Sequence, residues 1–304
     1  MHLAMAPEAR LRLSETGPGR SFMCESGIRT RFGICLLLST VAVVAAACTT
    51  SPTGTAPGNT NDGTRSGAAS AAVGVDVPGV YDPSTGSFFL ATAGDATIAV
   101  NYGGTGMVPL AGDWNGDGSQ TIGIYDAAHA MFYLKNSNEP GGADLVFLYG
   151  PGDAIPLSGD WNGDGKDTVG IYDAKSGTFF LTDVNATGNA LYTFTFGAEN
   201  SRPVVGDWDG DGRDTVGVYI PSKALFFLTD GFKGEPGGVQ VEYAAPDLVP
   251  LAGDWDGDGK DSIGAYDPKT GTFLLRNALT GGPADVTRSL GAPGLVPIVG
   301  RWSR

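Results

Sequence analysis

The chain of 304 residues contains 48 glycines and 19 prolines, 41% of its residues are hydrophobic, and 33 acidic residues outnumber 19 basic ones. Glycine and proline at about twice their usual share exclude a mainly helical protein, while the hydrophobic content excludes a disordered one. The formal net charge of −14 predicts that nucleic acid is not a partner, because phosphate binding requires a basic surface.

The first 47 residues are predicted to be an export signal. An apolar run from Phe32 to Ala47 follows Arg29 and Arg31. The run is short for a membrane helix and suits the core of a secretory signal. Because the 31 residues ahead of it form a long and partly acidic lead, we expect translation to start at Met23.

The cysteines of the chain all lie at or before Cys48. The sequence Ala45-Ala46-Ala47-Cys48 resembles the lipobox of bacterial lipoproteins, which implies a lipidated Cys48 and an acyl anchor. Cleavage near Ala47, which would release a secreted protein, is the alternative. Residues 48–74 are rich in Ser, Thr, Gly, Ala and Pro, so a flexible linker is expected between the lipidated cysteine and the next domain.

The rest of the chain is built from a repeat of 47 residues. The triplet Gly-Asp-Trp begins at Gly112, Gly159, Gly206 and Gly253, and the variant Gly-Arg-Trp begins at Gly300, every step being 47 residues. The five tryptophans of the chain all lie in these triplets. Such regular spacing indicates repeated units that pack against their neighbours.

Each unit contains four runs that are typical of β-strands. In the second unit they span 155–159, 168–172, 178–181 and 191–196, with glycine-rich turns between them. Four antiparallel strands in 47 residues match one propeller blade. The pattern opens on a second strand at residues 79–81 and ends on a first strand at 296–302.

This phase predicts how the chain closes. We predict an all-β fold over residues 75–304, a five-bladed β-propeller with four-stranded antiparallel blades, closed by pairing of the N- and C-terminal strands. An open solenoid is the alternative. Because Trp302 persists in the unit that lacks an acidic loop, the tryptophans are predicted to pack between blades.

An acidic loop follows the first strand in four of the units. Oxygen ligands at positions 1, 3 and 5 with glycine at position 6 are what a Ca²⁺ loop requires, together with a carbonyl at position 7 and a later carboxylate. The candidate side-chain ligands are Asp113, Asn115, Asp117, Asp160, Asn162, Asp164, Asp207, Asp209, Asp211, Asp254, Asp256 and Asp258. Position 7 would ligate through its carbonyl in Ser119, Lys166, Arg213 and Lys260, and the closing carboxylates would be Asp167, Asp214 and Asp261.

Hard oxygen ligands without His or Cys predict Ca²⁺, in up to four structural sites. The first loop has two carboxylates, the second three, and the third and fourth four each, so the third and fourth are predicted to bind most tightly. Metal-free turns are the alternative, because Asp-Gly and Asn-Gly are good turn sequences in themselves.

The loops, the four-strand unit and the endings Tyr149-Gly150 and Phe196-Gly197 resemble the FG-GAP and VCBS-type repeats of bacterial surface proteins and integrin α-chain propellers. The resemblance covers about residues 79–302. It implies Ca²⁺-binding loops with a structural role and a propeller that serves recognition or adhesion. Two features differ from that family: the closing aspartate comes one residue earlier, and five blades replace the seven of integrins.

These features predict a surface-tethered, Ca²⁺-stabilised module that binds a glycan or a protein. The connections 135–144, 182–189, 229–238 and 276–285 differ between units while the scaffold keeps its register, and such loops carry function. We expect an exported, monomeric cell-envelope lipoprotein that meets the membrane through its anchor alone, or a secreted protein if Cys48 is not lipidated. A structural envelope protein without a ligand is one alternative.

A hydrolase or lyase that acts on polysaccharide is the other alternative. Catalysis would require groups that break the repeat symmetry, and beyond residue 47 the chain has one histidine, His129, on a turn. Since no pair of carboxylates stands out and no nucleophile motif occurs, we predict no catalytic residues.

Overall fold

The computed structural model describes residues 74–92, 96–233 and 238–302. These described residues belong to one compact unit. The predicted signal sequence, Cys48 and linker residues 49–73 lie outside the described residues. No helix in the described part of the chain is long and apolar enough to cross a membrane.

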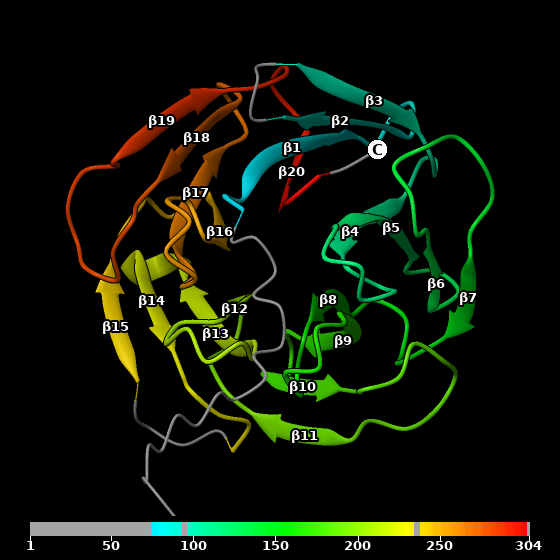
Figure 1. Cartoon of the computed structure of the whole chain (residues 1–304). Coiled ribbons are helices and arrows are strands. Elements are labelled where there is room, and N and C mark those ends of the chain that lie inside the picture. The colour runs from blue at the N-terminus through cyan, green and yellow to red at the C-terminus, as the bar shows by residue number, and fades with distance from the viewer. Residues whose placement is uncertain (1–73, 93–95, 234–237, 303–304) are drawn as a thin grey trace, which may run out of the picture. The chain divides into compact units, whose positions relative to one another are not determined.

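The described residues form five four-stranded antiparallel sheets arranged in a ring, which is a five-bladed β-propeller (Figure 1). The predicted fold class is therefore confirmed. The first strand of each blade is β4 (Met107–Gly112), β8 (Ile155–Gly159), β12 (Arg202–Gly206), β16 (Val249–Gly253) or β20 (Val296–Gly300). The second strands are β5 (Thr121–Asp126), β9 (Thr168–Asp173), β13 (Thr215–Ile220), β17 (Ser262–Asp267) and β1 (Val77–Asp82).

The outer half of each blade consists of the third and fourth strands. The third strands are β6 (Met131–Leu134), β10 (Thr178–Leu181), β14 (Leu225–Leu228), β18 (Thr272–Leu275) and β2 (Ser87–Ala91). The fourth strands are β7 (Leu145–Leu148), β11 (Tyr192–Thr195), β15 (Val239–Glu242), β19 (Val286–Ser289) and β3 (Thr97–Asn101). A short 3₁₀ turn, η1 (Pro221–Lys223), joins β13 to β14.

We number the blades by chain order. Blade 1 contains β4 to β7, blade 2 contains β8 to β11, blade 3 contains β12 to β15, and blade 4 contains β16 to β19. The composite blade has the order β20-β1-β2-β3, so both ends of the propeller contribute to it. The acidic segments after the first strands are loop 1 (113–120), loop 2 (160–167), loop 3 (207–214) and loop 4 (254–261).

The ring is closed by pairing of the first and last strands. Strand β1 pairs with β20 in antiparallel register from Val77 opposite Gly300 to Tyr81 opposite Val296. The first strands contact one another all round the axis, β20 with β4, β4 with β8, β8 with β12, β12 with β16, and β16 with β20. Because of this closure, β1 has a hydrogen-bonded partner on both sides, β20 and β2.

The hydrophobic core lies between neighbouring blades. Each blade packs a fully buried tyrosine of its second strand against a phenylalanine of its third at a tilted angle, as in Tyr125 and Phe132, whose ring centroids are 4.5 Å apart. Trp114 belongs to the same cluster as these two, together with Val169 and Ile171 of blade 2. The tryptophans of loops 2 to 4 occupy the equivalent clusters, so the predicted packing role is confirmed.

Glycine at the first position of each triplet is required by this packing. A Cβ atom placed on Gly112 would lie 2.6 Å from the Trp114 ring, and one on Gly159 would lie 2.9 Å from the Trp161 ring. Such distances are shorter than any real carbon–carbon contact, because the indole lies directly on the backbone of the first strand. The Gly-x-Trp spacing therefore sets how closely each loop sits against its blade.

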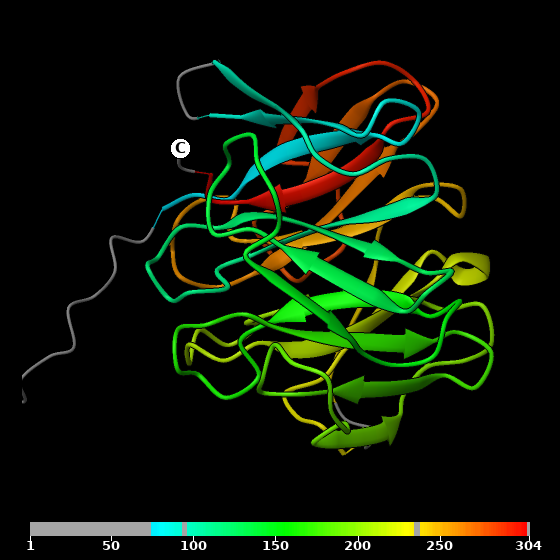
Figure 2. The same cartoon turned by 90° about the vertical axis from the view of Figure 1, so that its right-hand side faces the viewer.

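Two sets of connections emerge on the same side of the ring, which we call the loop face. Because the strands alternate in direction, the acidic loops leave on the same face as the connections between third and fourth strands; Figure 2 shows the ring edge-on. Hydrogen bonds join the two sets: Asn138 Nδ2 donates to the Gln120 carbonyl (3.1 Å), and Asn185 Nδ2 donates to the Asp167 carbonyl (2.9 Å). Two of the variable connections, 135–144 and 182–189, are therefore hydrogen-bonded to acidic loops 1 and 2.

Candidate functional site

Each acidic loop is folded around the carboxylate at its first position. Asp113 Oδ1 accepts hydrogen bonds from the N–H groups of Gly116 (2.7 Å) and Asp117 (3.1 Å), and Oδ2 accepts one from Gly118 (2.7 Å). The same bonds recur around Asp160, Asp207 and Asp254. Gly116 and Gly118 have φ angles of +77° and +86°, which only glycine adopts without strain.

The residues at positions 3 and 5 distinguish two kinds of loop. In loops 3 and 4 both are aspartates, and with position 1 they bring three carboxylate oxygens within 4.8 Å of one another. In loops 1 and 2 position 3 is an asparagine whose amide donates to position 5, from Asn115 to Asp117 (2.9 Å) and from Asn162 to Asp164 (3.1 Å). Three convergent hard oxygens fit Ca²⁺, so the residues of loops 3 and 4 suit this ion best.

Position 7 is held close to these oxygens. The N–H groups of Ser119, Lys166, Arg213 and Lys260 each donate to the carboxylate at position 5 of the same loop, at 2.9 Å in every case. Ligation through their carbonyls stays a prediction.

The side chain at position 7 extends over the preceding loop. A Cβ on Gly116 of loop 1 would lie 2.8 Å from Lys166 Cγ, and one on Gly210 of loop 3 would lie 3.0 Å from Lys260 Cγ. Arg213 reaches loop 2, where its Nε donates to the Trp161 carbonyl at 2.7 Å. Beside loop 4 the corresponding residue is Val75, which is uncharged. The basic residue whose charge acts on Asp254 and Asp261 of loop 4 is Arg301.

The closing aspartates are directed away from their own loops. Asp167 Oδ2 accepts a hydrogen bond from the Asp113 N–H of loop 1 at 2.6 Å, and Asp214 and Asp261 make the same bond to Asp160 (2.8 Å) and Asp207 (3.0 Å). Neither Asp214 nor Asp261 joins the oxygen triad of its own loop. Ligation of Ca²⁺ by these three residues stays a prediction. They reach the neighbouring blade because position 8 comes immediately before the second strand, on the side where that blade lies.

These bonds form part of a two-bond latch between blades. At each junction one residue, which we call the latch residue, accepts a hydrogen bond through its side chain from a backbone N–H of the neighbouring unit. Its own N–H donates to the carbonyl of that same neighbouring residue, as Asp167 does to Asp113 at 2.8 Å. The remaining junctions are Asp214 with Asp160 (2.9 Å), Asp261 with Asp207 (2.8 Å), Asp76 with Asp254 (2.8 Å) and Gln120 with Arg301 (3.1 Å). Five latches therefore join all five blades on the loop face.

Asp76 and Gln120 were not among the predicted site residues. Gln120 stands 47 residues before Asp167, so the repeat spacing marks its position, but its side chain carries no charge. Asp76 occupies the same place, immediately before β1. The spacing from Asp76 to Gln120 is three residues shorter than the repeat of 47, so the repeat does not mark it. Asp76 Oδ2 accepts from the Asp254 N–H (2.9 Å), and Gln120 Oε1 accepts from the Arg301 N–H (3.1 Å).

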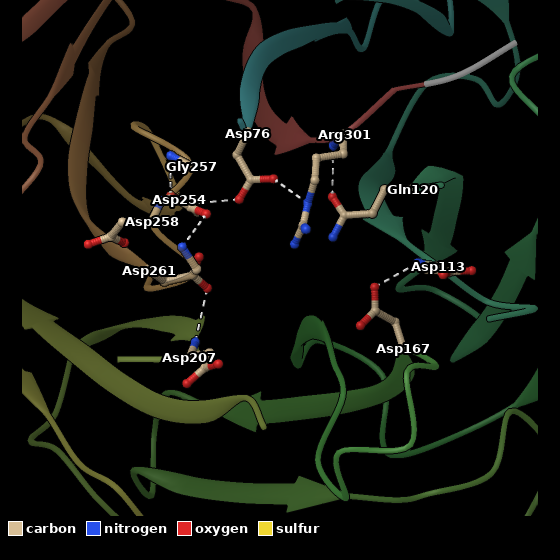
Figure 3. A network of polar contacts seen from close by, with 11 residues as sticks. Asp76, Asp113, Gln120, Asp167, Asp207, Asp254, Gly257, Asp258, Asp261 and Arg301 are labelled. Atoms are coloured by element: carbon tan, nitrogen blue, oxygen red, sulfur yellow. Dashed lines mark hydrogen bonds and ion pairs between the residues drawn. The ribbon is translucent and has the colours of Figure 1, made fainter. Parts of the chain in front are cut away.

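The latch residues line a cavity of about 530 Å³ on the axis of the ring. Figure 3 shows Asp76, Asp167 and Asp261 projecting toward the same space from different blades, with the guanidinium of Arg301 between them. Arg301 Nε lies 3.0 Å from Asp76 Oδ1. The walls are formed by the inner strands, including the small residues Ala111 and Ser158 that the sequence places next to the axis.

Electrostatics in this cavity disfavour the charged form of its carboxyls. Burial, supplemented by neighbouring carboxylates, raises the pKa of Asp167 to about 6 and that of Asp261 to about 8. Burial and the charges of Asp167 and Asp261 raise the pKa of Asp214 well above its usual value. Burial also raises the pKa of Asp76, although Arg301 acts against it. Protons or another cation would therefore stabilise the cavity.

His129 lies apart from these groups, on the turn between β5 and β6. Its side chain is 73% exposed, and its Nδ1 lies 2.5 Å from Asp126 Oδ2. It is not among the residues that line the axial cavity.

No protein-family model and no curated protein matches the chain. The five-bladed ring predicted from the repeat spacing is present. The resemblance to FG-GAP and VCBS-type repeats stays an interpretation of the loop motif.

Proposed function

We propose that this chain is an exported, monomeric binding module, tethered to the cell envelope through lipidated Cys48, which recognises a glycan or a protein with its loop face. One observation carries this proposal: the acidic loops, the variable connections and the axial cavity all lie together on a single, latched face of the ring. Variable loops on a rigid scaffold are the usual arrangement in recognition proteins. The proposal assigns no catalytic role.

Two of the variable connections, 135–144 and 276–285, are held by internal hydrogen bonds. The Asn136 N–H donates to Asp144 Oδ2 (2.7 Å), and the Asn277 N–H makes the same bond to Asp285 Oδ2 (2.9 Å). Arg276 further ties its connection through Nε to the Thr280 carbonyl (2.5 Å). Loops that are ordered in advance lose less conformational entropy when they bind a partner.

Exposed apolar side chains on β7 of blade 1 and on the 182–191 segment of blade 2 support a macromolecular partner. We call them the patch; they are Val146, Leu148, Val184 and Leu191, which are 54%, 46%, 61% and 60% exposed. The Leu148 N–H donates to Thr187 Oγ1 at 3.1 Å, which places the 182–190 connection beside β7. Exposed apolar side chains that gather in one place are typical of interaction sites.

The function would depend on Ca²⁺ as a structural ion. Loops 3 and 4 hold three convergent carboxylates each, and the loop motif resembles the Ca²⁺ loops of FG-GAP and VCBS-type repeats. Bound Ca²⁺ would offset the mutual repulsion of these carboxylates and fix the loop face. Calorimetric titration of the full chain with Ca²⁺ tests this part of the proposal. The absence of heat, with an unchanged melting temperature in EGTA, would contradict it.

Recognition is tested with a glycan array and a cell-wall pull-down, both with the full chain. Retention of a defined glycan or protein is expected. A Val184→Ser variant removes an apolar side chain from the patch, while Lys175→Ala alters the turn between β9 and β10 on the opposite face. We expect the first to weaken retention and the second to leave it unchanged.

Other outcomes favour the alternatives. A chain that nothing retains would indicate a structural envelope protein, and release of sugars from a polysaccharide would indicate an enzyme. The anchor is tested separately by labelling with a palmitate analogue, which we expect in the wild type and not in Cys48→Ser.

A further inference from the structure

The axial cavity contains more negative than positive side chains. Four latch carboxyls, Asp76, Asp167, Asp214 and Asp261, line it together with one guanidinium, that of Arg301. The carboxylates at position 1 of the acidic loops, Asp113, Asp160, Asp207 and Asp254, line it as well. The latch carboxyls alone, when ionised, outnumber the guanidinium by four to one. Each latch carboxyl is fixed by a backbone N–H of the neighbouring blade, so it cannot rotate away from the cavity without breaking a latch.

The separation of these carboxyls rules out direct coordination of a single metal ion by all of them. Among the described residues, the groups in which three carboxylate oxygens come within 4.8 Å of one another are the triads of loops 3 and 4. No three latch carboxyls meet that limit. A cavity of about 530 Å³ also exceeds the space that one ion needs and lies in the range of organic ligands.

A second observation, independent of the carboxyls, indicates the type of cation. The chain itself places an organic cation in the cavity, because the Arg301 guanidinium lies 3.0 Å from Asp76 and points into the space between blades (Figure 3). Loops 1 to 4 have aspartate at the position that Arg301 occupies. One side of the cavity is thus already complementary to a nitrogen cation, while Asp167 and Asp214 line the part toward blades 2 and 3.

The walls of the cavity suit an alkyl chain. Beside the carboxyls it is lined by Pro109, Pro156, Pro203 and Pro250 of the inner strands, together with Leu157 and Leu251. A ligand with a cationic end and an aliphatic arm would place charge against the latch carboxyls and apolar atoms against these walls.

We propose that the axial cavity binds an alkylammonium or alkylguanidinium group through Asp167, Asp214 and Asp261. Two sources share this chemistry, a free aliphatic amine and a Lys or Arg side chain of a partner protein. The inference rests on the proposed binding function, since it names the class of ligand that the loop face admits at its centre.

The test is isothermal titration of the full chain, with Ca²⁺ present, against 1,5-diaminopentane and agmatine. The neutral isostere 1,5-pentanediol is the control ligand. We expect both cations to bind one site per chain and the diol not to bind. Equal binding of the diol, or no binding of either cation, would overturn the proposal.

Variants assign the binding to the cavity. Asp214→Asn removes a charge while its amide oxygen can keep the latch, as Gln120 does at another junction. We expect Asp214→Asn and Asp167→Asn each to weaken binding by about tenfold. Asp247→Asn removes the same charge from an exposed site outside the cavity and should leave the affinity unchanged. Equal losses in all three variants would mean that net charge alone attracts the amines.

A lysine-containing peptide with blocked ends distinguishes the two sources. Tighter binding of the peptide than of diaminopentane indicates a protein partner, and the reverse indicates a free amine. If one Ca²⁺ ion per cavity displaces the bound amines, the cavity is a metal site and the inference is overturned. A chain that retains a glycan on the array and ignores every amine would overturn this inference alone and leave the proposed function standing.

Discussion

The side chain of Gln120 accepts a hydrogen bond from the backbone N–H of Arg301 at 3.1 Å, and this bond joins blade 1 to the last segment of the composite blade. The other four junctions make the same bond with an aspartate. An uncharged amide therefore suffices for the latch, and the four carboxylates carry a charge that the latch itself does not require. This separates what the latch residues contribute to stability from what their charge contributes to binding.

Replacement of a latch aspartate should distinguish these two contributions. We expect Asp214→Ala to lower the free energy of unfolding by about 1–3 kcal/mol, because the Asp160 N–H loses its partner. Asp214→Asn should be at least as stable as the wild type in EGTA, since it keeps the bond and removes a repelled charge. Urea unfolding measures both. Equal destabilisation by the two variants would show that the amide cannot form the latch at this junction.

Stability without Ca²⁺ should fall as the pH rises. The folded pKa values of Asp167 (about 6) and Asp261 (about 8) exceed the value of 3.8 expected in the unfolded chain, so the folded protein binds more protons between these limits. The stabilisation by the protonated carboxyls is complete below about pH 4 and is lost as the pH rises through about 6 and then about 8.

Urea unfolding in EGTA at about pH 5 and about pH 9 measures this change. The double variant Asp167→Asn, Asp261→Asn should show a smaller decrease over the same range. A wild-type chain that becomes more stable with increasing pH would contradict the expected protonation of the cavity.

The repeat made most of the fold predictable. The constant step of 47 residues fixed the blade size, and the phase of residues 79–81 and 296–302 fixed the closure, because both are local properties of the chain. The direction of Asp167, Asp214 and Asp261 was not predictable, since it depends on the neighbouring blade. Gln120 lacks the charge that marks the other latch residues. The axial cavity exists only when all five blades are assembled, so no single unit reveals it.

Loop 4 should bind Ca²⁺ more tightly than loop 3. Both hold three convergent carboxylates, but the loop 3 glycine Gly210 lies against Lys260, whereas Val75 is the corresponding residue beside loop 4. The cation near loop 4, Arg301, is paired with Asp76, whose negative charge offsets it. A nearby ammonium disfavours a second cation. At a free Ca²⁺ concentration of about 100 times the Kd, each site should add about 2.7 kcal/mol to the free energy of unfolding.

Titration of two matched variants measures the difference between the loops. Asp256→Asn should remove the tighter of the two binding events and Asp209→Asn the weaker one. Identical residual isotherms would contradict the role of Lys260.

The position two residues before each tryptophan should tolerate no residue larger than glycine. A Cβ on Gly159 would lie 2.9 Å from both Trp161 and Val205, so Gly159→Ala should lower the free energy of unfolding by about 1–3 kcal/mol. Gly188 has no atom within 4 Å of such a Cβ, and Gly188→Ala is the matched control with little expected effect. Thermal unfolding of the two variants decides the matter. Similar melting temperatures of the two variants would show that the contact of Gly159 with Trp161 and Val205 leaves room for a side chain.

The propeller should depend on its last strand. Removal of residues 296–304 would leave β1 without its partner from Val77 to Tyr81 and would take away Arg301, which binds Asp76. An unpaired inner strand favours association between chains. We therefore expect the truncated chain to unfold with lower cooperativity in urea and to elute as oligomers.

A circular permutant provides the matched control, with residue 302 joined to residue 76 by a short Gly-Ser linker and new ends opened at Gly188. Because it keeps every strand pair and cuts only an exposed connection, it should remain monomeric and unfold as the wild type does. A truncated chain as stable as this permutant would show that the strand pairing of β1 with β20 does not hold the ring closed.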